Sequence, residues 1–172
     1  MRILATAVMV VLAGSALAQH HPHKHEQSPY TGMQSRAVKT LSDQQVADLR
    51  AGRGMGMALA AELNGYPGPM HVLELAQSLG LSTEQRERVQ WLIDTMKAEA
   101  IAAGEKLIDG EAALDRAFKE RSINSAQLAQ LSTAIGAFQG ELRAVHLKYH
   151  LTTADLLSPD QMRRYAELRG YR

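Results

Sequence analysis

The chemistry that this sequence could support centres on histidine, of which the chain has seven. Four of the seven lie in one short polar stretch near the start, as His20, His21, His23 and His25. Imidazole ligates zinc, copper and nickel, and a short histidine-rich tract is a composition typical of metal binding. The other interpretation is a solvated arm to which metals bind only adventitiously.

A second pair of histidines, His146 and His150, lies four residues apart within a predicted helix. Residues at this spacing share a helix face, so the two imidazoles could hold one metal ion between them. Zinc proteases place a glutamate next to the first histidine of such a pair, and here that position is Leu147. Hydrolysis therefore lacks a supporting residue, and a metal would need a further ligand from another element or a second subunit. The alternative is that both histidines flank an apolar seam and pack or cap.

Other positions carry weaker signals for metal binding. His71 follows Met70 and precedes Glu74 by one turn, although a lone histidine at a helix start is more often structural. Met55 and Met57 could offer thioethers to Cu(I), or they could be adaptable packing residues or part of a client-binding surface. No catalytic residue set can be nominated. We therefore expect no enzyme and no obligatory cofactor, only a bound Zn, Cu or Ni ion.

The first residues have the pattern of a secretory signal peptide. Arg2 precedes an apolar run from Ile3 to Ala13, and small residues follow up to Ala18. The run is shorter than the roughly 20 apolar residues that a membrane span needs, which makes a retained anchor the weaker interpretation. We predict cleavage after Ala18, a mature chain that begins at Gln19, and a periplasmic protein without stable membrane insertion.

Composition narrows the class of protein further. The chain has 172 residues, 19 basic and 18 acidic side chains, and no cysteine. Removal of Arg2 with the signal leaves 18 of each sign, so electrostatics argues against nucleic-acid binding. Without disulfides, stability must come from helix packing or oligomerisation. We predict a signal peptide over 1–18, a flexible histidine-rich arm over 19–36 and a single helical domain over 37–172.

A helix-start signal, Leu-Ser-x-x-Gln, occurs three times, beginning at Leu41, Leu81 and Leu157. The serine hydroxyl can accept a bond from a free N–H of the first turn, and the glutamine can return one to the serine backbone. Three glycines at positions 52, 54 and 56 predict a break or a close helix contact inside the first helix. The caps, the apolar spacing and the turn residues predict helices over 43–64, 70–79, 82–121, 126–156 and 159–168.

The two longest predicted helices each carry one apolar stripe. The stripes comprise Val89, Leu92, Met96, Ala100, Ala103, Leu107, Leu114 and Phe118, and then Leu128, Leu131, Ile135, Phe138, Leu142, Val145 and Tyr149. A short turn over 122–125 makes the two helices antiparallel. No strand signal appears. We therefore predict an all-α fold, a long antiparallel α-hairpin with flanking shorter helices, and a homodimer that covers the seam.

With these elements in place, the chain resembles the Spy/CpxP periplasmic family, named for a Leu-Thr-x-x-Gln motif, and its heavy-metal-sensor and zinc-resistance relatives. The positions that match the motif are Leu81, Ser82 and Gln85, and then Leu157, Ser158 and Gln161. Serine replaces threonine in both copies, a mild change because both hydroxyls cap helices. The resemblance spans roughly residues 41–171.

This resemblance implies an all-helical, cradle-shaped antiparallel dimer. Family members act as ATP-independent chaperones, as inhibitory partners of envelope-stress sensor kinases, or as metal sensors that use His-x-x-x-His and His-x-x-x-Met helix pairs. Within the predicted helices only His146 and His150 match the first pattern, and the chain has no His-x-x-x-Met. We expect a metal-binding stress-response protein that senses, buffers or confers resistance to heavy metals. The alternative is a chaperone for unfolded envelope proteins, or a modulator of a sensor kinase's periplasmic domain.

Overall fold

The computed structural model describes residues 28–171. The predicted signal peptide and the histidines at positions 20, 21, 23 and 25 therefore lie outside the described residues. Ser28 to Thr31 form a turn in which the Thr31 N–H donates to the Ser28 carbonyl at 2.9 Å. The residues from Gly32 onward form a separate compact unit, which contains every helix discussed below.

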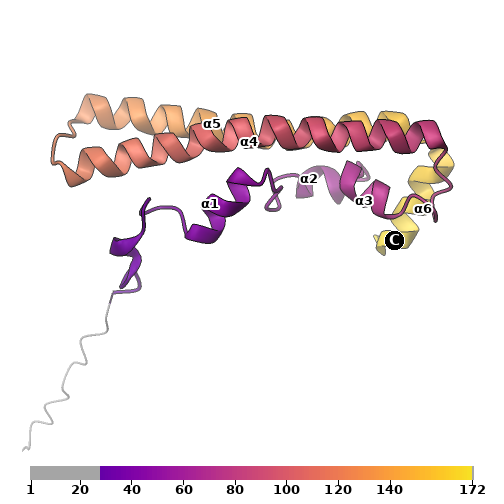
Figure 1. Ribbon diagram of the computed structural model, residues 1–172, viewed down its shortest axis with the longest axis horizontal. Helices are drawn as coiled ribbons and strands as arrows, with labels where there is room; N and C mark the ends of the chain where they lie inside the picture. The colour runs from indigo at the N-terminus through magenta and orange to yellow at the C-terminus, as the bar shows by residue number, and fades with distance from the viewer. Residues whose placement is uncertain (1–27, 172) are drawn as a thin grey trace, which may run out of the picture. The chain divides into compact units, whose positions relative to one another are not determined.

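The described residues are helical and contain no strand. The elements, in chain order, are a 3-10 turn Met33–Ser35, α1 (Asp43–Arg50), α2 (Leu59–Glu62), α3 (Pro69–Glu74), α4 (Thr83–Lys119), α5 (Ser125–Leu156) and α6 (Pro159–Arg169). Helices α4 and α5 pack against each other as a long antiparallel pair (Figure 1). The predicted all-α hairpin with shorter flanking helices is confirmed.

Each of the three predicted helix starts is a complete capping box. The Ser42, Ser82 and Ser158 hydroxyls each accept a bond from the backbone N–H of the glutamine three residues on, and each serine donates its own backbone N–H to the Oε1 of that glutamine. A fourth box, formed by Asn124 and Gln127, begins α5 and was not predicted from the Leu-Ser-x-x-Gln pattern. The boundaries of the long helices therefore follow from local hydrogen-bond chemistry.

The predicted helix over 43–64 is interrupted at its three glycines: α1 ends at Arg50, and α2 is a single turn from Leu59 to Glu62. The chain between them passes through Gly52 and Gly56 with φ angles of 65° and 77°. A Cβ on Gly52 would lie 2.9 Å from the Lys97 carbonyl oxygen of α4, so only glycine allows this approach. The glycines thus produce both the break and the close contact that their positions suggested. Helix α3 is also shorter than the predicted 70–79 and ends at Glu74.

The apolar seam of the hairpin is buried over most of its length. On α4 the predicted positions from Val89 to Leu107 are all buried, and on α5 so are Ile135, Leu142 and Tyr149. Near the turn between the helices the stripe is exposed in this single chain: Phe118 is 54% exposed there and Leu128 is 42% exposed. The predicted stripe is longer than the surface that the flanking helices cover.

The two motifs that carry the family resemblance also contact each other. The side-chain amides of Gln85 and Gln161 form a reciprocal pair, with N···O distances of 2.9 and 3.0 Å. Gln85 also donates to the Leu156 carbonyl at 3.1 Å. The leucines that begin the motifs, Leu81 and Leu157, are buried in one apolar cluster. Each motif therefore caps its own helix and joins the start of α4 to the start of α6.

None of the helices within residues 28–171 combines the length and hydropathy that crossing a membrane would require.

Candidate functional site

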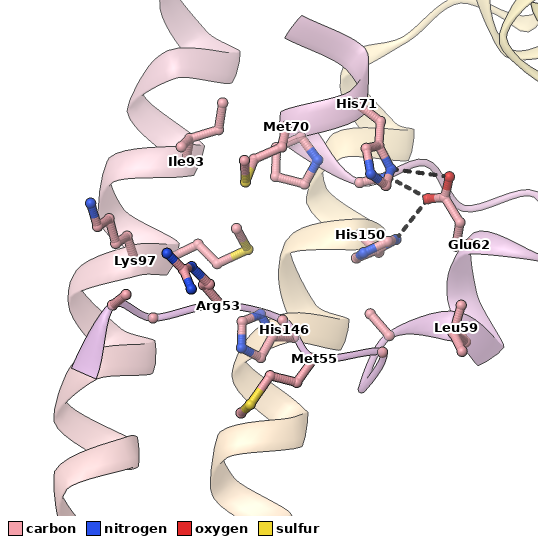
Figure 2. A pocket seen from close by; sticks show the side chains of 18 residues that line it. Arg53, Met55, Leu59, Glu62, Met70, His71, Ile93, Lys97, His146 and His150 are labelled. Carbon is pink, nitrogen blue, oxygen red and sulfur yellow. Dashed lines mark hydrogen bonds and ion pairs between the residues drawn. The ribbon is translucent and has the colours of Figure 1, made fainter. Parts of the chain in front are cut away.

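A pocket of about 690 Å³ lies between α4, α5 and the segment from Ala51 to His71 (Figure 2). Its floor includes Met96 of α4 and the two histidines of α5, His146 and His150. Its outer wall is the glycine-rich chain after α1 together with the start of α3. The pocket therefore lies where the interrupted chain after α1 passes over the hairpin.

The hairpin helices are fixed to each other beside the two histidines. Lys148, between them in sequence, lies 2.6 Å from a carboxylate oxygen of Glu99 on α4, and the Tyr149 hydroxyl donates to the other oxygen at 3.0 Å. The Lys148 hydrogen bond lowers the pKa of Glu99 below its usual value, although burial opposes the change. This contact holds the register of α5 against α4 at the pocket.

One side of the pocket is built around Glu62 of α2, which is only 5% exposed. The Tyr165 and Tyr171 hydroxyls donate to its Oε1, the latter at 2.9 Å, and the Gly68 N–H donates to Oε2 at 3.0 Å. The His71 Nδ1 lies 3.3 Å from Oε1. We call these five residues the Glu62 cluster. It ties α2 and the start of α3 to the C-terminal helix.

Hydrogen bonding decides the charge state of this carboxyl group. Burial raises the pKa of Glu62, but the two tyrosine hydroxyls, the Gly68 N–H and the charge of His71 together lower it below 4.5. Burial and the bond to Glu62 raise the pKa of Tyr165 in turn. The cluster therefore holds a carboxylate whose oxygens have donors, and Arg169 lies 3.7 Å away as a further positive charge.

His150 stands at the border of the Glu62 cluster. Its ring is largely buried, and its Nδ1 donates to the Tyr66 carbonyl at 2.7 Å, with Glu62 Oε2 at 3.7 Å. This bond fixes the tautomer, so that Nε2 carries the lone pair. Figure 2 shows one ring nitrogen turned towards Glu62 and the other towards the pocket. A Cβ on Gly68 would lie 3.0 Å from that second nitrogen, so glycine is required beside it.

His146, one helical turn before His150, has a different environment. It is 3% exposed, and its Nε2 is the one buried side-chain nitrogen or oxygen in residues 28–171 with no hydrogen-bond partner. Burial, and then the charge of His150, lower the pKa of His146 below 6.5. At neutral pH the ring is therefore uncharged and keeps a lone pair. Gly54 lies beside the ring, and a Cβ on it would lie 3.7 Å from Nδ1.

Three methionines line the same pocket as His146. Met55 belongs to the chain between α1 and α2, Met70 to α3 and Met96 to α4. We call these three residues and His146 the methionine side. Figure 2 draws Met55 at the same end of the pocket as His146, and the Met70 sulfur nearer to Ile93. Three elements therefore bring thioether groups to one cavity.

The structure brings together most of the described residues that were predicted as ligands. His146 and His150 share the pocket, and so do the weaker candidates His71 and Met70. Met57 does not line it and packs instead against the core cluster that contains Leu49. No group of three histidines, aspartates or glutamates in the described part of the chain is arranged to hold a metal ion.

Sequence reasoning did not find the Glu62 cluster. Glu62 is one of 18 acidic residues, and its two tyrosine partners lie more than 100 residues further along the chain. No local spacing could indicate these contacts. The motif residues Leu81, Ser82 and Gln85, and their counterparts in the second copy, do not line the pocket.

Comparisons with models of known protein families, with curated proteins and with solved structures found no match for this chain.

Proposed function

We propose that this chain is an exported metal-binding protein that senses or buffers a transition metal in the pocket between α4 and α5. The observation that carries the proposal is the buried, unpartnered Nε2 of His146. Leaving such a group without a partner costs about 1–3 kcal/mol, and native structures contain few of them. A ligand that accepts the lone pair of Nε2 would remove this cost.

His150 supports the proposal as a second nitrogen ligand. Histidines that bind metals commonly donate their other ring N–H to a carbonyl or carboxylate, which fixes the tautomer and the ring orientation. The bond from His150 Nδ1 to the Tyr66 carbonyl has this form and leaves Nε2 available. The two rings would supply nitrogen ligands from a single helix face, and other pocket side chains would complete the coordination.

Export to the periplasm and a role in the stress response complete the proposal. The arrangement of Arg2, the apolar run and Ala18 supports a cleaved signal, and the resemblance to the Spy/CpxP family supports metal handling in that compartment. Because the sequence nominates no nucleophile or general base, we propose a binding role rather than catalysis. The histidine-rich stretch over 20–25 would act as an additional, separate collector of metal.

Calorimetric titration tests the metal site. The full chain is prepared with the four histidines at positions 20, 21, 23 and 25 replaced by alanine, so that only the pocket contributes. Zn(II), Cu(II), Ni(II) and Ag(I) are titrated into this chain and into the same chain with His146→Leu. The proposal expects at least one metal to bind with micromolar or tighter affinity, with the binding lost in His146→Leu. Met57→Leu serves as the control, because Met57 lies outside the pocket and packs against the core cluster that contains Leu49.

A second candidate function, an ATP-independent chaperone or a modulator of a sensor kinase, has support from a different observation. Large apolar side chains are exposed along α2, α3 and the chain between them. Leu59, Leu63, Tyr66 and Met70 are 55%, 60%, 43% and 54% exposed, respectively. Such a row could contact unfolded envelope proteins, because clustered exposed apolar groups mark interaction surfaces.

Suppression of client aggregation in metal-free buffer tests this second function. The Leu59→Ser/Leu63→Ser variant is expected to lose protection. A Leu151→Ser variant, which changes an equally exposed leucine on α5, is expected to retain it. Equal protection by all three proteins would contradict a client surface on this segment.

A further inference from the structure

The methionine side of the pocket carries information about which metal would bind. A thioether sulfur has no charge and is a poor ligand for hard cations, but it is a preferred ligand of soft ones such as Cu(I). Met55 and Met70 are 40% and 54% exposed, so burial of apolar surface does not account for their positions. Met96 is buried and also lines the pocket.

Met55 occupies a strained position in the backbone. Its φ angle is 43°, in the left-handed region where a Cβ lies too close to the following carbonyl oxygen, which costs free energy. Its neighbours in sequence are Gly54 and Gly56, and a third glycine at position 55 would remove that cost. Strain of this kind concentrates at functional sites, where the surrounding structure holds the residue in place. The side chain that is retained at this cost lines the pocket.

The charges around the methionine side disfavour a divalent cation. Two basic residues, Arg53 and Lys97, line the pocket. The Arg53 Nη1 pairs with the Asp48 Oδ1 at 2.5 Å, and Figure 2 shows the Lys97 amine turned away from His146. The one carboxylate of the pocket wall is Glu62, whose oxygens already accept from Tyr165, Tyr171, His71 and the Gly68 N–H. A cation bound beside His146 would therefore have neutral ligands, which suit a single positive charge better than two.

We propose that the pocket is a site for a soft monovalent metal, Cu(I), held by the Nε2 of His146 and by thioether sulfurs of Met55, Met70 and Met96. The inference deepens the proposed function and rests on it, because it names the metal class and adds three ligands. His150 would add a second nitrogen from the same helix. Zn(II) and Ni(II), which prefer imidazole, thiolate and carboxylate ligands, would bind this ligand set weakly.

Ag(I) is the probe, because it has the charge and the ligand preference of Cu(I) and is not oxidised during the titration. The full chain with the four arm histidines replaced by alanine is titrated with Ag(I) and, separately, with Zn(II) in chloride-free buffer. The variants are Met96→Leu, the double variant Met55→Leu/Met70→Leu, and the matched control Met57→Leu, whose methionine lies outside the pocket. Leucine conserves volume, so the fold is retained, as circular dichroism of each variant verifies.

The inference expects Ag(I) to bind more tightly than Zn(II). Both pocket variants should weaken Ag(I) binding about tenfold or more, as loss of a metal ligand does, and Met57→Leu should leave it unchanged. The inference is overturned if Ag(I) affinity is unchanged in both pocket variants, or if it falls by the same factor in Met57→Leu. If Zn(II) or Ni(II) binds through His146 and Ag(I) does not, this inference fails and the proposed function stands. If no metal binds, both fail.

Discussion

The two sides of the pocket use polar groups in opposite ways. In the Glu62 cluster a buried carboxylate receives donors from two tyrosines, a backbone amide and a histidine, and its pKa is lowered. On the methionine side a buried imidazole nitrogen has no partner, and the side chains around it are thioethers. These two arrangements lie one helical turn apart on α5, since His150 borders the first and His146 belongs to the second.

The difference separates groups that hold the fold from groups that are free to bind. A buried carboxylate with several donors stabilises the elements that it joins, here α2, which carries Glu62, and α3 and α6, which supply donors, and it has little capacity left for a ligand. An unpartnered imidazole destabilises the empty protein slightly and gains most from a ligand. His150 combines the two roles, because one nitrogen is bonded to Tyr66 and the other faces the pocket.

The largest effect is expected from Glu62→Gln. The substitution removes the charge and turns an amide NH₂ towards groups that are themselves donors. We expect the free energy of unfolding to fall by about 2–3 kcal/mol, the scale of a lost hydrogen bond to a charged group. Urea unfolding measures the change. The control Glu105→Gln, in an exposed pair with Arg50, should cost less than about 1 kcal/mol.

The same residue predicts a pH dependence. Because the folded-state pKa of Glu62 lies below 4.5, ionised Glu62 contributes stability at pH values above its unfolded pKa. That contribution is lost as the pH falls below 4.5 and through the lowered folded-state pKa. The unfolding free energy of Glu62→Gln should therefore change less with pH over this acidic range than that of the unchanged protein. If the unfolding free energies of the two proteins changed equally with pH over this range, Glu62 would not have a lowered pKa in the folded state.

A smaller effect separates the two histidines directly. His150→Leu removes the largely buried ring that donates to the Tyr66 carbonyl, and should cost about 1–3 kcal/mol. His146→Leu removes a nitrogen that has no partner, so it should cost little or increase stability. Urea unfolding of both variants in metal-free buffer makes the comparison. A greater loss in His146→Leu than in His150→Leu would reverse the assignment of roles.

Gly68→Ala tests the close packing behind His150. The added Cβ would lie 2.9 Å from the ring carbon Cε1, so the ring or the backbone must move, at a cost of about 1–2 kcal/mol. Gly136→Ala is the control, because nothing lies within 4 Å of its Cβ position in α5. There, alanine should stabilise the helix by up to about 1 kcal/mol. Thermal unfolding distinguishes the opposite signs.

The smallest change is expected from Met55→Gly. Glycine adopts a φ of 43° without strain, so the unfolding free energy should rise by less than about 1 kcal/mol. Ag(I) affinity should fall in the same variant. Stability measured by urea and affinity measured by calorimetry would then move in opposite directions. A loss of stability would show that Met55 is a packing residue.

The sequence predicted what local chemistry controls. The capping boxes at Ser42, Ser82 and Ser158 involve residues three apart, and the shared face of the two α5 histidines follows from the helix repeat. The partners of those groups could not be predicted. The hydrogen bond from His150 to Tyr66 joins residues 84 positions apart in the sequence, and the bonds between the motif glutamines join residues 76 positions apart.

The interruption after α1 also depends on a contact that is distant in sequence and could not be predicted. Gly52, Gly54 and Gly56 indicated a break or a close contact, but only the packing against Lys97 of α4 explains why both occur. The interrupted segment forms one wall of the pocket. The methionines could be nominated from composition as soft ligands, yet Met55 enters the site and Met57 enters the core. The two side chains have the same chemistry, and the left-handed backbone at Met55 and Gly56 directs them to different places.

The most direct test of the central claim is the ¹⁵N resonance of His146 Nε2 in the full chain without arm histidines, recorded before and after one equivalent of Ag(I). The account predicts the shift of an unprotonated, unbonded imidazole nitrogen first, and a metal-bound shift afterwards, while the Nδ1 of His150 stays bonded to Tyr66. A His146 Nε2 resonance that stays in place when Ag(I) saturates the protein would contradict it.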